Sequence, residues 1–247
     1  MDRLIWTAVS GMNASMARER MIANNMANSQ TPGFRAEVMA ATPVTLHGPS
    51  LQVRALTDAA VYGAQMDPGA LVETGRPLDL AVGGDALLSV QAADGSEAYT
   101  RRGDLSVSPS GLLVNGEGYA VIGETGPISV PPGSDVTIGK DGAVLVRNLS
   151  DPAAPAQQVD KIKLASWRGS RIEKGLDGLF RVYGGGALPA DAAAQVITSS
   201  LEQSNVKPAQ VLVEMVEAQR LYDMRTKLIA TAKELDEGGA SLMRLGA

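Results

Sequence analysis

The sequence contains no cysteine, a single histidine and few aromatic side chains. Without cysteine there can be no disulfides, thiol nucleophiles or cysteine-based zinc sites, and this composition suits a protein that works in an oxidising compartment. Aromatic residues make up 4% of the 247 residues, whereas 45% of the residues are hydrophobic. We therefore expect a substantial core that is built mainly from aliphatic side chains.

Long apolar runs and an excess of basic charge are also missing. No segment approaches the roughly 20 apolar residues that a membrane-spanning helix needs. Asp2 lies near the start, and no apolar run with a small-residue cleavage site follows, so we expect no cleaved secretory signal. The formal net charge is −5 and no basic stripe follows either end of the chain, which argues against nucleic acid as a partner.

No motif for catalysis is recognisable. The one histidine, His47, lies in a segment rich in proline and glycine and is interpreted as a surface-loop residue. Asp79 and Asp85 could in principle act as a glycosidase-like pair, but both lie at predicted strand ends, where turn chemistry explains them. No nucleophile elbow, zinc-protease helix or phosphate-binding loop occurs. We predict no enzymatic activity, no cofactor and no metal site.

Both ends of the chain are predicted to be long helices. Residues 2–27 place apolar side chains at alternating steps of four and three, the spacing of a coiled-coil seam. The seam consists of Ile5, Val9, Met12, Met16, Ala23 and Met26. Gly11 weakens an isolated helix by roughly 1 kcal/mol, and the close approach of another helix would explain it.

The first helix leads into an asparagine-rich segment and a turn at Pro32-Gly33, which Phe34 follows. Asparagine tolerates the left-handed conformation at helix ends, and Pro-Gly forces a turn. Two interpretations stay open. The segment is an ordinary helix terminus with a docking aromatic residue, or its asparagines make polar contacts with other subunits, through Asn24, Asn25 and Asn28.

Residues 208–236 form the second predicted helix. Ser204 or Asn205 would cap it, Pro208 suits its first position, and Gly238-Gly239 would end it. Its apolar residues form two stripes, so this helix should contact partners on two sides. The first stripe is Val211, Met215, Ala218, Tyr222, Ile229 and Ala232, and the second is Leu212, Val216, Leu221, Met224, Leu228 and Leu235.

The segment between the helices is rich in turns and short strands. Residues 36–75 show no sustained period and are interpreted as an extended connector with short strands. Residues 76–200 contain many short apolar runs, separated by turn signals such as Asp94-Gly95, Asp141-Gly142 and Asp177-Gly178. This spacing is typical of a mainly antiparallel sandwich or barrel-like domain.

The predicted fold class is α+β. The terminal helices, in residues 1–35 and 201–247, would pair as a discontinuous, coiled-coil-like rod domain, with the connector at 36–75 and a β-rich outer domain at 76–200. At 1.5 Å per residue the helices span roughly 39 and 44 Å, so they match well enough to lie antiparallel. Long helices depend on packing their apolar faces. The layout therefore suits a self-assembling structural protein better than an enzyme.

Several motifs resemble the rod and hook proteins of the bacterial flagellum, the axial protein family. The matching segments, in the family's order, are Ala23–Asn28 with Thr31–Arg35, Gly75–Val82 with Gly84-Asp85, Tyr99–Gly103 with Gly111–Val114, and Leu201–Val206 with Met215–Tyr222 and Lys227. Within this family, residues 1–8, 31–36 and 123–128 are more similar to the proximal rod members, and the distal rod members are the alternative.

The resemblance implies a structural subunit of the periplasmic rod in the flagellar basal body. Such a subunit would transmit torque from motor to hook, surround the export channel, and leave the cell unfolded through the type III export apparatus without a cleaved signal. The implied partners are other copies of the chain and the neighbouring proximal and distal rod proteins, with no nucleic acid and no membrane span. The residues expected to serve assembly are Ile5, Val9, Met12, Met16, Asn24, Asn25, Met26, Asn28, Pro32, Gly33, Phe34, Ser204, Asn205, Val211, Met215, Gln219, Arg220, Tyr222 and Ile229.

Two other classes make different predictions. A secreted enzyme or carbohydrate-binding domain needs a pocket with convergent polar groups in residues 76–200. A coiled-coil adhesin forms a small closed oligomer instead of a helical array.

Overall fold

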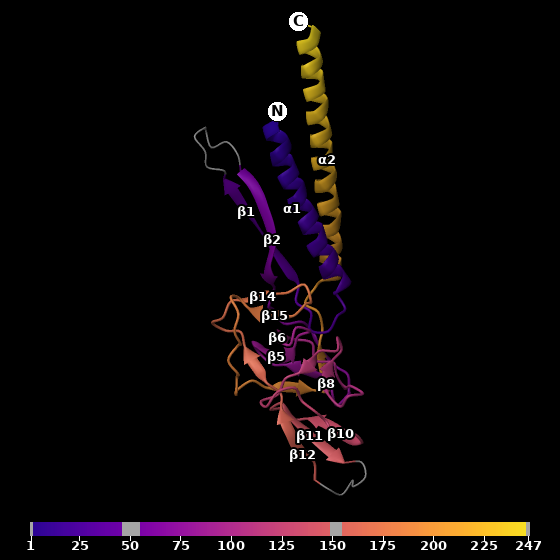
Figure 1. Ribbon diagram of the computed structural model, residues 1–247. Coiled ribbons are helices and arrows are strands. Elements are labelled where there is room, and N and C mark those ends of the chain that lie inside the picture. Colours follow the sequence, from indigo (N-terminus) through magenta and orange to yellow (C-terminus); the bar gives the residue numbers. More distant parts are fainter. Residues whose placement is uncertain (1, 46–54, 149–154, 246–247) are drawn as a thin grey trace. The chain divides into compact units, whose positions relative to one another are not determined.

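The computed structural model describes residues 2–45, 55–148 and 155–245. It has the α+β composition that was predicted, with one helix near each end of the chain and strands between them (Figure 1). His47 lies outside the described residues. The chain divides into two units that alternate along the sequence. The helical unit consists of Met1–Ala27, Glu37–Gly63 and Lys207–Ala247, and the β unit consists of Asn28–Ala36 and Ala64–Val206.

This division differs from the predicted domain boundaries at three places. Most of the predicted connector, Glu37–Gly63, belongs with the helices. It forms a two-stranded sheet of β1 (Glu37–Thr45) and β2 (Ala55–Ala64), and β1 contacts helix α1. Residues 28–35 and 201–206 fall in the predicted helical ends, but both segments belong to the β unit.

The two helices pack against each other and run in opposite directions (Figure 1). Helix α1 spans Asp2–Ala27, as predicted, and helix α2 spans Pro208–Leu245. The predicted end of α2 at Gly238-Gly239 is wrong, because the helix continues through both glycines. Each glycine disfavours a helix by only about 1 kcal/mol, and the alanine, leucine, methionine and arginine residues that follow are strong helix formers.

Helix α1 has a narrow buried face, and its phase differs from that of the predicted seam. The buried residues are Ala14, Ser15, Ile22 and Asn25. Met16 and Ala23 of the predicted seam lie on the exposed side, whereas Val9, Met12 and Met26 are half-buried. The side chain of Ile5 lies outside the described ones. The predicted coiled-coil pairing through this seam is therefore not confirmed and stays a prediction.

The β unit is built from antiparallel pairings. Its largest sheet follows the order β14 (Ile172–Lys174), β15 (Phe180–Val182), β6 (Glu97–Thr100), β5 (Ala86–Gln91), β9 (Ala120–Val121), β8 (Leu113–Asn115) and β7 (Leu105–Val107), and β13 (Leu164–Ser166) also pairs with β5. A second sheet contains β10 (Ser134–Ile138), β11 (Ala143–Asn148) and β12 (Gln157–Lys161), while β4 (Leu80–Val82) pairs with β16 (Val196–Thr198) and β3 (Leu71–Glu73) with β17 (Ser200–Glu202). None of these sheets closes into a barrel within the described segments.

The core of the β unit is mainly aliphatic and lies on both faces of strand β5. Leu88 and Val90 belong to the main cluster, which β10 and β11 complete with residues such as Val144. Leu87 points to a second cluster that contains Tyr99. Burial on both faces explains why this strand reads as a continuous apolar run and not as an alternating one.

Candidate assembly site

The turn after helix α1 is fixed by a close approach of two backbones. Gly33 has φ +70°, a conformation that favours glycine. A Cβ atom at this position would lie 2.4 Å from the backbone of Arg101, and the Gly33 amide donates to the Glu202 carbonyl at 2.7 Å. No larger residue fits here. The turn therefore meets two other segments of the sequence, one near residue 101 and one near residue 202.

A buried cluster of ionic side chains joins the same three segments. Glu202 Oε1 accepts from Arg35 Nη2 at 2.7 Å, and Glu202 Oε2 accepts from Arg101 Nε at 2.9 Å. Arg101 Nη1 also donates to the carbonyls of Gly84 and Ala86 at 2.9 and 2.6 Å. All three ionic side chains are at least 96% buried. We call Arg35, Arg101 and Glu202 the ionic triad.

Burial lowers the pKa of Arg101, and the neighbouring Glu202 carboxylate opposes that shift. Because an arginine pKa starts above 12, the guanidinium stays protonated. The triad is thus a fixed arrangement of charges that ties residues 35, 101 and 202 together. Sequence reasoning missed these three residues as a site, although each lies inside a motif that carries the family resemblance.

Asn205 holds two more segments of the β unit. Its Oδ1 accepts from the Ala36 amide at 2.7 Å, and its Nδ2 donates to the carbonyls of Gln65 and Asp67 at 2.8 and 2.9 Å. The prediction that Ser204 or Asn205 caps helix α2 is wrong. The helix begins at Pro208, as predicted for that proline, and its first turn is closed by the carbonyl of Lys207.

In the helical unit the Asn25 side chain bonds to both backbone groups of Glu37, as a neighbouring strand would. Its Nδ2 donates to the Glu37 carbonyl at 3.0 Å, and its Oδ1 accepts from the Glu37 amide at 2.8 Å. Asn24 Nδ2 donates to the Glu37 carboxylate at 2.6 Å. The Asn25 side chain is 6% exposed and serves a contact within the chain, while a contact of these asparagines with another subunit stays a prediction. Asn28 likewise bonds to Thr31.

The contact between the two helices includes a polar bridge. Arg225 Nη1 donates to the Gly11 carbonyl and to Ser15 Oγ. Arg225 is a charged residue between the apolar residues Tyr222 and Ile229 of the first stripe, and it faces α1. A Cβ atom at Gly11 would lie 3.6 Å from Arg225 Nε, which is an ordinary contact distance.

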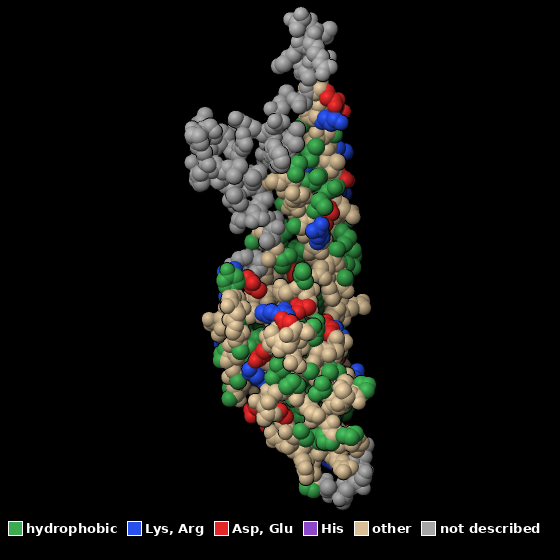
Figure 2. Space-filling view, viewed as in Figure 1, with side chains coloured by type: hydrophobic (Ala, Val, Ile, Leu, Met, Phe, Trp, Pro, Cys, Tyr) green, Lys and Arg blue, Asp and Glu red, His purple; other side chains and the backbone are tan. Residues whose placement is uncertain are grey.

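Helix α2 buries one apolar stripe and exposes the other. In the first stripe Val211 and Ala218 are buried, and Met215, Tyr222 and Ile229 are half-buried. The second stripe is exposed except for Leu221, with Leu228 at 64% and Leu235 at 65% exposure, and apolar side chains recur along this helix in Figure 2. We call Leu212, Val216, Met224, Leu228 and Leu235 the outer stripe. The polar Gln219 and Arg220 are also exposed.

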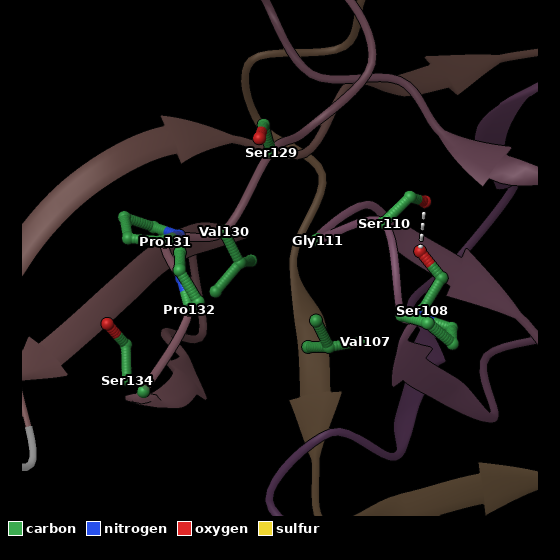
Figure 3. Close-up of a pocket in the computed structure, with 11 residues that line it drawn as sticks. Val107, Ser108, Ser110, Gly111, Ser129, Val130, Pro131, Pro132 and Ser134 are labelled. Atoms are coloured by element: carbon green, nitrogen blue, oxygen red, sulfur yellow. Dashed lines mark hydrogen bonds between the residues drawn. The ribbon is translucent and has the colours of Figure 1, made fainter.

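One groove lies on the β unit, and it offers little for catalysis (Figure 3). Its volume is about 400 Å³, and it is lined by Val107, Ser108, Pro109, Ser110, Gly111, Ser129, Val130, Pro131, Pro132, Gly133 and Ser134. The Ser108 and Ser110 hydroxyls bond to each other at 2.9 Å. No titratable side chain lines the groove, so it lacks a general acid or base. The rival prediction of an enzyme pocket gains no support from it.

Neither a metal site nor a membrane span emerges from the residues that the structure describes. No group of three histidine, aspartate or glutamate side chains there could hold a metal ion. Among the described helices, none combines the length and the apolar character that crossing a membrane requires. Asp85 pairs with Arg168 at the surface, whereas Asp79 is buried, so the two carboxylates are in different environments.

Family models place these features in one class of protein. A model described as "Flagella basal body rod protein" matches residues 5–35, "Flagellar hook protein FlgE/F/G D1 domain" matches residues 81–146, and "Flagellar basal body rod FlgEFG protein C-terminal" matches residues 197–242. These ranges contain all three members of the ionic triad. The chain belongs to the family of flagellar rod and hook proteins.

Relatives over the full length narrow the assignment to the FlgF group. The chain is 40% identical to the flagellar basal-body rod protein FlgF of Salmonella typhimurium, over 98% of both chains. It is also 40% identical to FlgF of Escherichia coli, over 95% of both chains. The flagellar basal-body rod protein FlgG of Agrobacterium fabrum is 32% identical, over 94% of this chain and 96% of its own length.

Proposed function

We propose that this chain is a structural subunit of the proximal rod in the flagellar basal body. The observation that carries the proposal is the outer stripe of α2, which exposes large apolar side chains after α1 and α2 have paired. Monomeric proteins seldom expose a continuous apolar surface without a binding partner. Neighbouring rod subunits, either copies of this chain or other rod proteins, would cover that stripe.

The two units would divide the work of the rod. The helical unit would supply the packing between subunits. The apolar residues of α1 and α2 would pack on each other, within one subunit or between neighbouring subunits. These residues are Val9, Met12 and Met26 of α1 and Val211, Met215, Tyr222 and Ile229 of α2. The β unit would form the outer part. Torque would then pass through many contacts per subunit, so no single contact should dominate.

Export through the flagellar type III apparatus in an unfolded state would bring the subunit to the periplasm. The sequence is compatible with this route in that it has no cysteines that could form wrong disulfides on arrival. Folding of the outer stripe against neighbours would occur only after export.

The distal rod is the alternative position for the chain. The 40% identity to FlgF of Salmonella typhimurium and of Escherichia coli, against 32% to FlgG of Agrobacterium fabrum, favours the proximal rod. A secreted enzyme remains the rival from another class, and the groove on the β unit, without titratable groups, gives it no support.

Deletion of the gene tests the proposal, with electron cryotomography of the cell envelope and a swimming assay as readouts. We expect basal bodies that stop short of a complete rod and hook, and loss of motility that the wild-type gene restores. A second strain should carry Leu228→Glu, which places charge on the outer stripe, and a third should carry Lys227→Glu as a control beside it. Normal rods in the deletion strain would overturn the proposal.

A further inference from the structure

One hairpin of the β unit presents a fully exposed leucine. Residues 175–179 join strands β14 and β15, and we call this connection the tip. Leu176, within the tip, is 112% exposed, more than any other large apolar side chain in the part of the chain that the structure describes. A single exposed leucine needs no explanation by itself. The tip around it and a groove elsewhere on the same unit give this leucine a use.

The tip holds Leu176 in a fixed position. The Gly175 amide donates to the Leu179 carbonyl at 2.8 Å, and the Leu179 amide donates to Asp177 Oδ1 at 3.2 Å. Arg181 donates to both carboxylate oxygens of Asp177, at 3.0 and 2.6 Å, so the charge of Asp177 is paired. A contact that is already ordered before binding loses little conformational entropy when it forms. The tip is therefore a suitable anchor for a partner.

The groove on the β unit has the lining and the stiffness that an aliphatic anchor needs. Val107, which is 40% exposed, lines it together with the exposed Pro131 and Pro132, and Figure 3 shows Val107 on one side and the two prolines on the other. The proline rings restrict their backbone. The Val130 amide donates to the Gly111 carbonyl at 2.7 Å and so joins the two sides. The volume of about 400 Å³ exceeds that of a leucine side chain.

The tip and the groove belong to opposite edges of the same sheet. The strand order of that sheet begins with β14, which leads into the tip, and ends with β7, whose last residue is Val107. Because Leu176 is fully exposed, it does not occupy the groove of its own chain. A contact between the tip of one copy and the groove of another would use different surfaces on the two partners. Each copy would then keep one free tip or groove, and the contact would repeat around a ring or along a helix.

We propose that the Leu176 tip of one copy of this chain docks in the groove of the next copy. A second copy is the occupant because this chain carries both halves of the contact, each of them ordered before binding. A charged segment fits less well, because no titratable side chain lines the groove. Apolar side chains that fill a pocket on the partner often dominate the energy of an interface. The proposal rests on the proposed function, since it names a second surface, besides the outer stripe, through which rod subunits would meet.

The first test identifies the occupant directly. The deletion strain should carry Leu176→p-benzoylphenylalanine, which is photoreactive, and basal bodies isolated after illumination should be analysed by mass spectrometry. We expect a cross-link to residues 107–111 or 129–134 of a second copy. The control is Tyr183→p-benzoylphenylalanine, because Tyr183 is 56% exposed and lies at the other end of the same hairpin. A cross-link from position 176 to a different protein, or no cross-link, would overturn the proposal.

The second test uses the absence of natural cysteines. A chain with both Leu176→Cys and Val107→Cys carries one thiol on the tip and one at the groove. A short bismaleimide should join such copies in isolated basal bodies into a ladder of dimers, trimers and longer chains. Each single variant should stay monomeric, because position 176 would meet position 107 and not a second position 176. Dimers in Leu176→Cys alone, or monomers only in the double variant, would overturn the proposal.

The failure of this contact and the failure of the rod function give different results. Complete rods that contain the double variant but show no cross-link would overturn the contact and leave the structural role intact. Complete rods in the deletion strain would overturn the rod function itself.

Discussion

Replacing Glu202 with glutamine exchanges one carboxylate oxygen for an amide group. This substitution should destabilise the β unit strongly. The substitution keeps the size of the side chain but removes the carboxylate that Arg35 and Arg101 share. Removing one partner of a buried ion pair typically destabilises a protein by about 3–5 kcal/mol, because the remaining charge is left uncompensated. For a chain of this size that corresponds to a fall of roughly 6–20 °C in the unfolding midpoint.

Fluorescence of Trp167 is a suitable assay, because this residue packs against the second core cluster of the β unit. The measurement should use Trp6→Phe as the background, since Trp6 is the only other tryptophan. Glu173→Gln is the matched control. Glu173 is 49% exposed and lies 3.9 Å from Arg171, so its loss should change the stability by less than about 1 kcal/mol.

Similar losses in the free energy of unfolding for Glu202→Gln and Glu173→Gln would contradict this expectation. That result would mean that the triad contributes no more than a surface pair. A drop in Glu202→Gln that becomes smaller when Arg35→Met is added would instead support the charge argument, because the double variant also removes one of the two buried cations that Glu202 pairs with.

Three further predictions concern other parts of the chain. Met215→Asp should abolish swimming by placing a charge in the contact between helices, while the Trp167 midpoint of the purified protein stays unchanged; a motile strain would contradict this. Asn25→Ala leaves the amide and carbonyl of Glu37 without their side-chain partner, so the Glu37 amide should exchange hydrogen faster and the helical unit should lose about 1–3 kcal/mol of stability. Unchanged exchange would show that the two Asn25–Glu37 hydrogen bonds are dispensable. Burial raises the pKa of Tyr99 to about 12, above the value of about 10 in the unfolded chain, so the stability that its neutral form provides should be lost between about pH 10 and 12. Tyr99→Phe should show a shallower fall over that range in urea titrations, although it is less stable at every pH because the Leu188 amide loses its acceptor; parallel curves for the two proteins would be evidence against this account.

The helices and most strands of the β unit could be predicted from local patterns. Helix α1 has the predicted bounds, and the turns at Gly95, Gly142 and Gly178 have the positive φ that their Asp-Gly signals require. The end of α2 could not be predicted, because a pair of glycines weakens a helix without necessarily ending it. Strand β12, Gln157–Lys161, was also missed, because a strand at a sheet edge with exposed side chains has no apolar alternation.

The ionic triad was missed for a different reason. Its members lie 66 and 101 positions apart in the sequence, and a charged residue at a strand end usually indicates solvent exposure. Only the fold shows that Arg35, Arg101 and Glu202 are buried together. Similarly, Asn205 has the chemistry of a helix cap, but the extended segments that it contacts compete successfully for its amide.

The alternation of the two units along the sequence has a mechanical consequence. The backbone passes between the units four times, after Ala27, Ala36, Gly63 and Val206. A load applied to one unit is therefore shared among four covalent connections, whereas a domain attached at its end by a single linker carries the whole load on one. One of these crossings, between Ala36 and Glu37, is bonded on each side: Asn205 accepts from the Ala36 amide within the β unit, and Asn25 accepts from the Glu37 amide within the helical unit. A connection whose two ends are each fixed to its own unit has little slack, which is a useful property for a part that carries load.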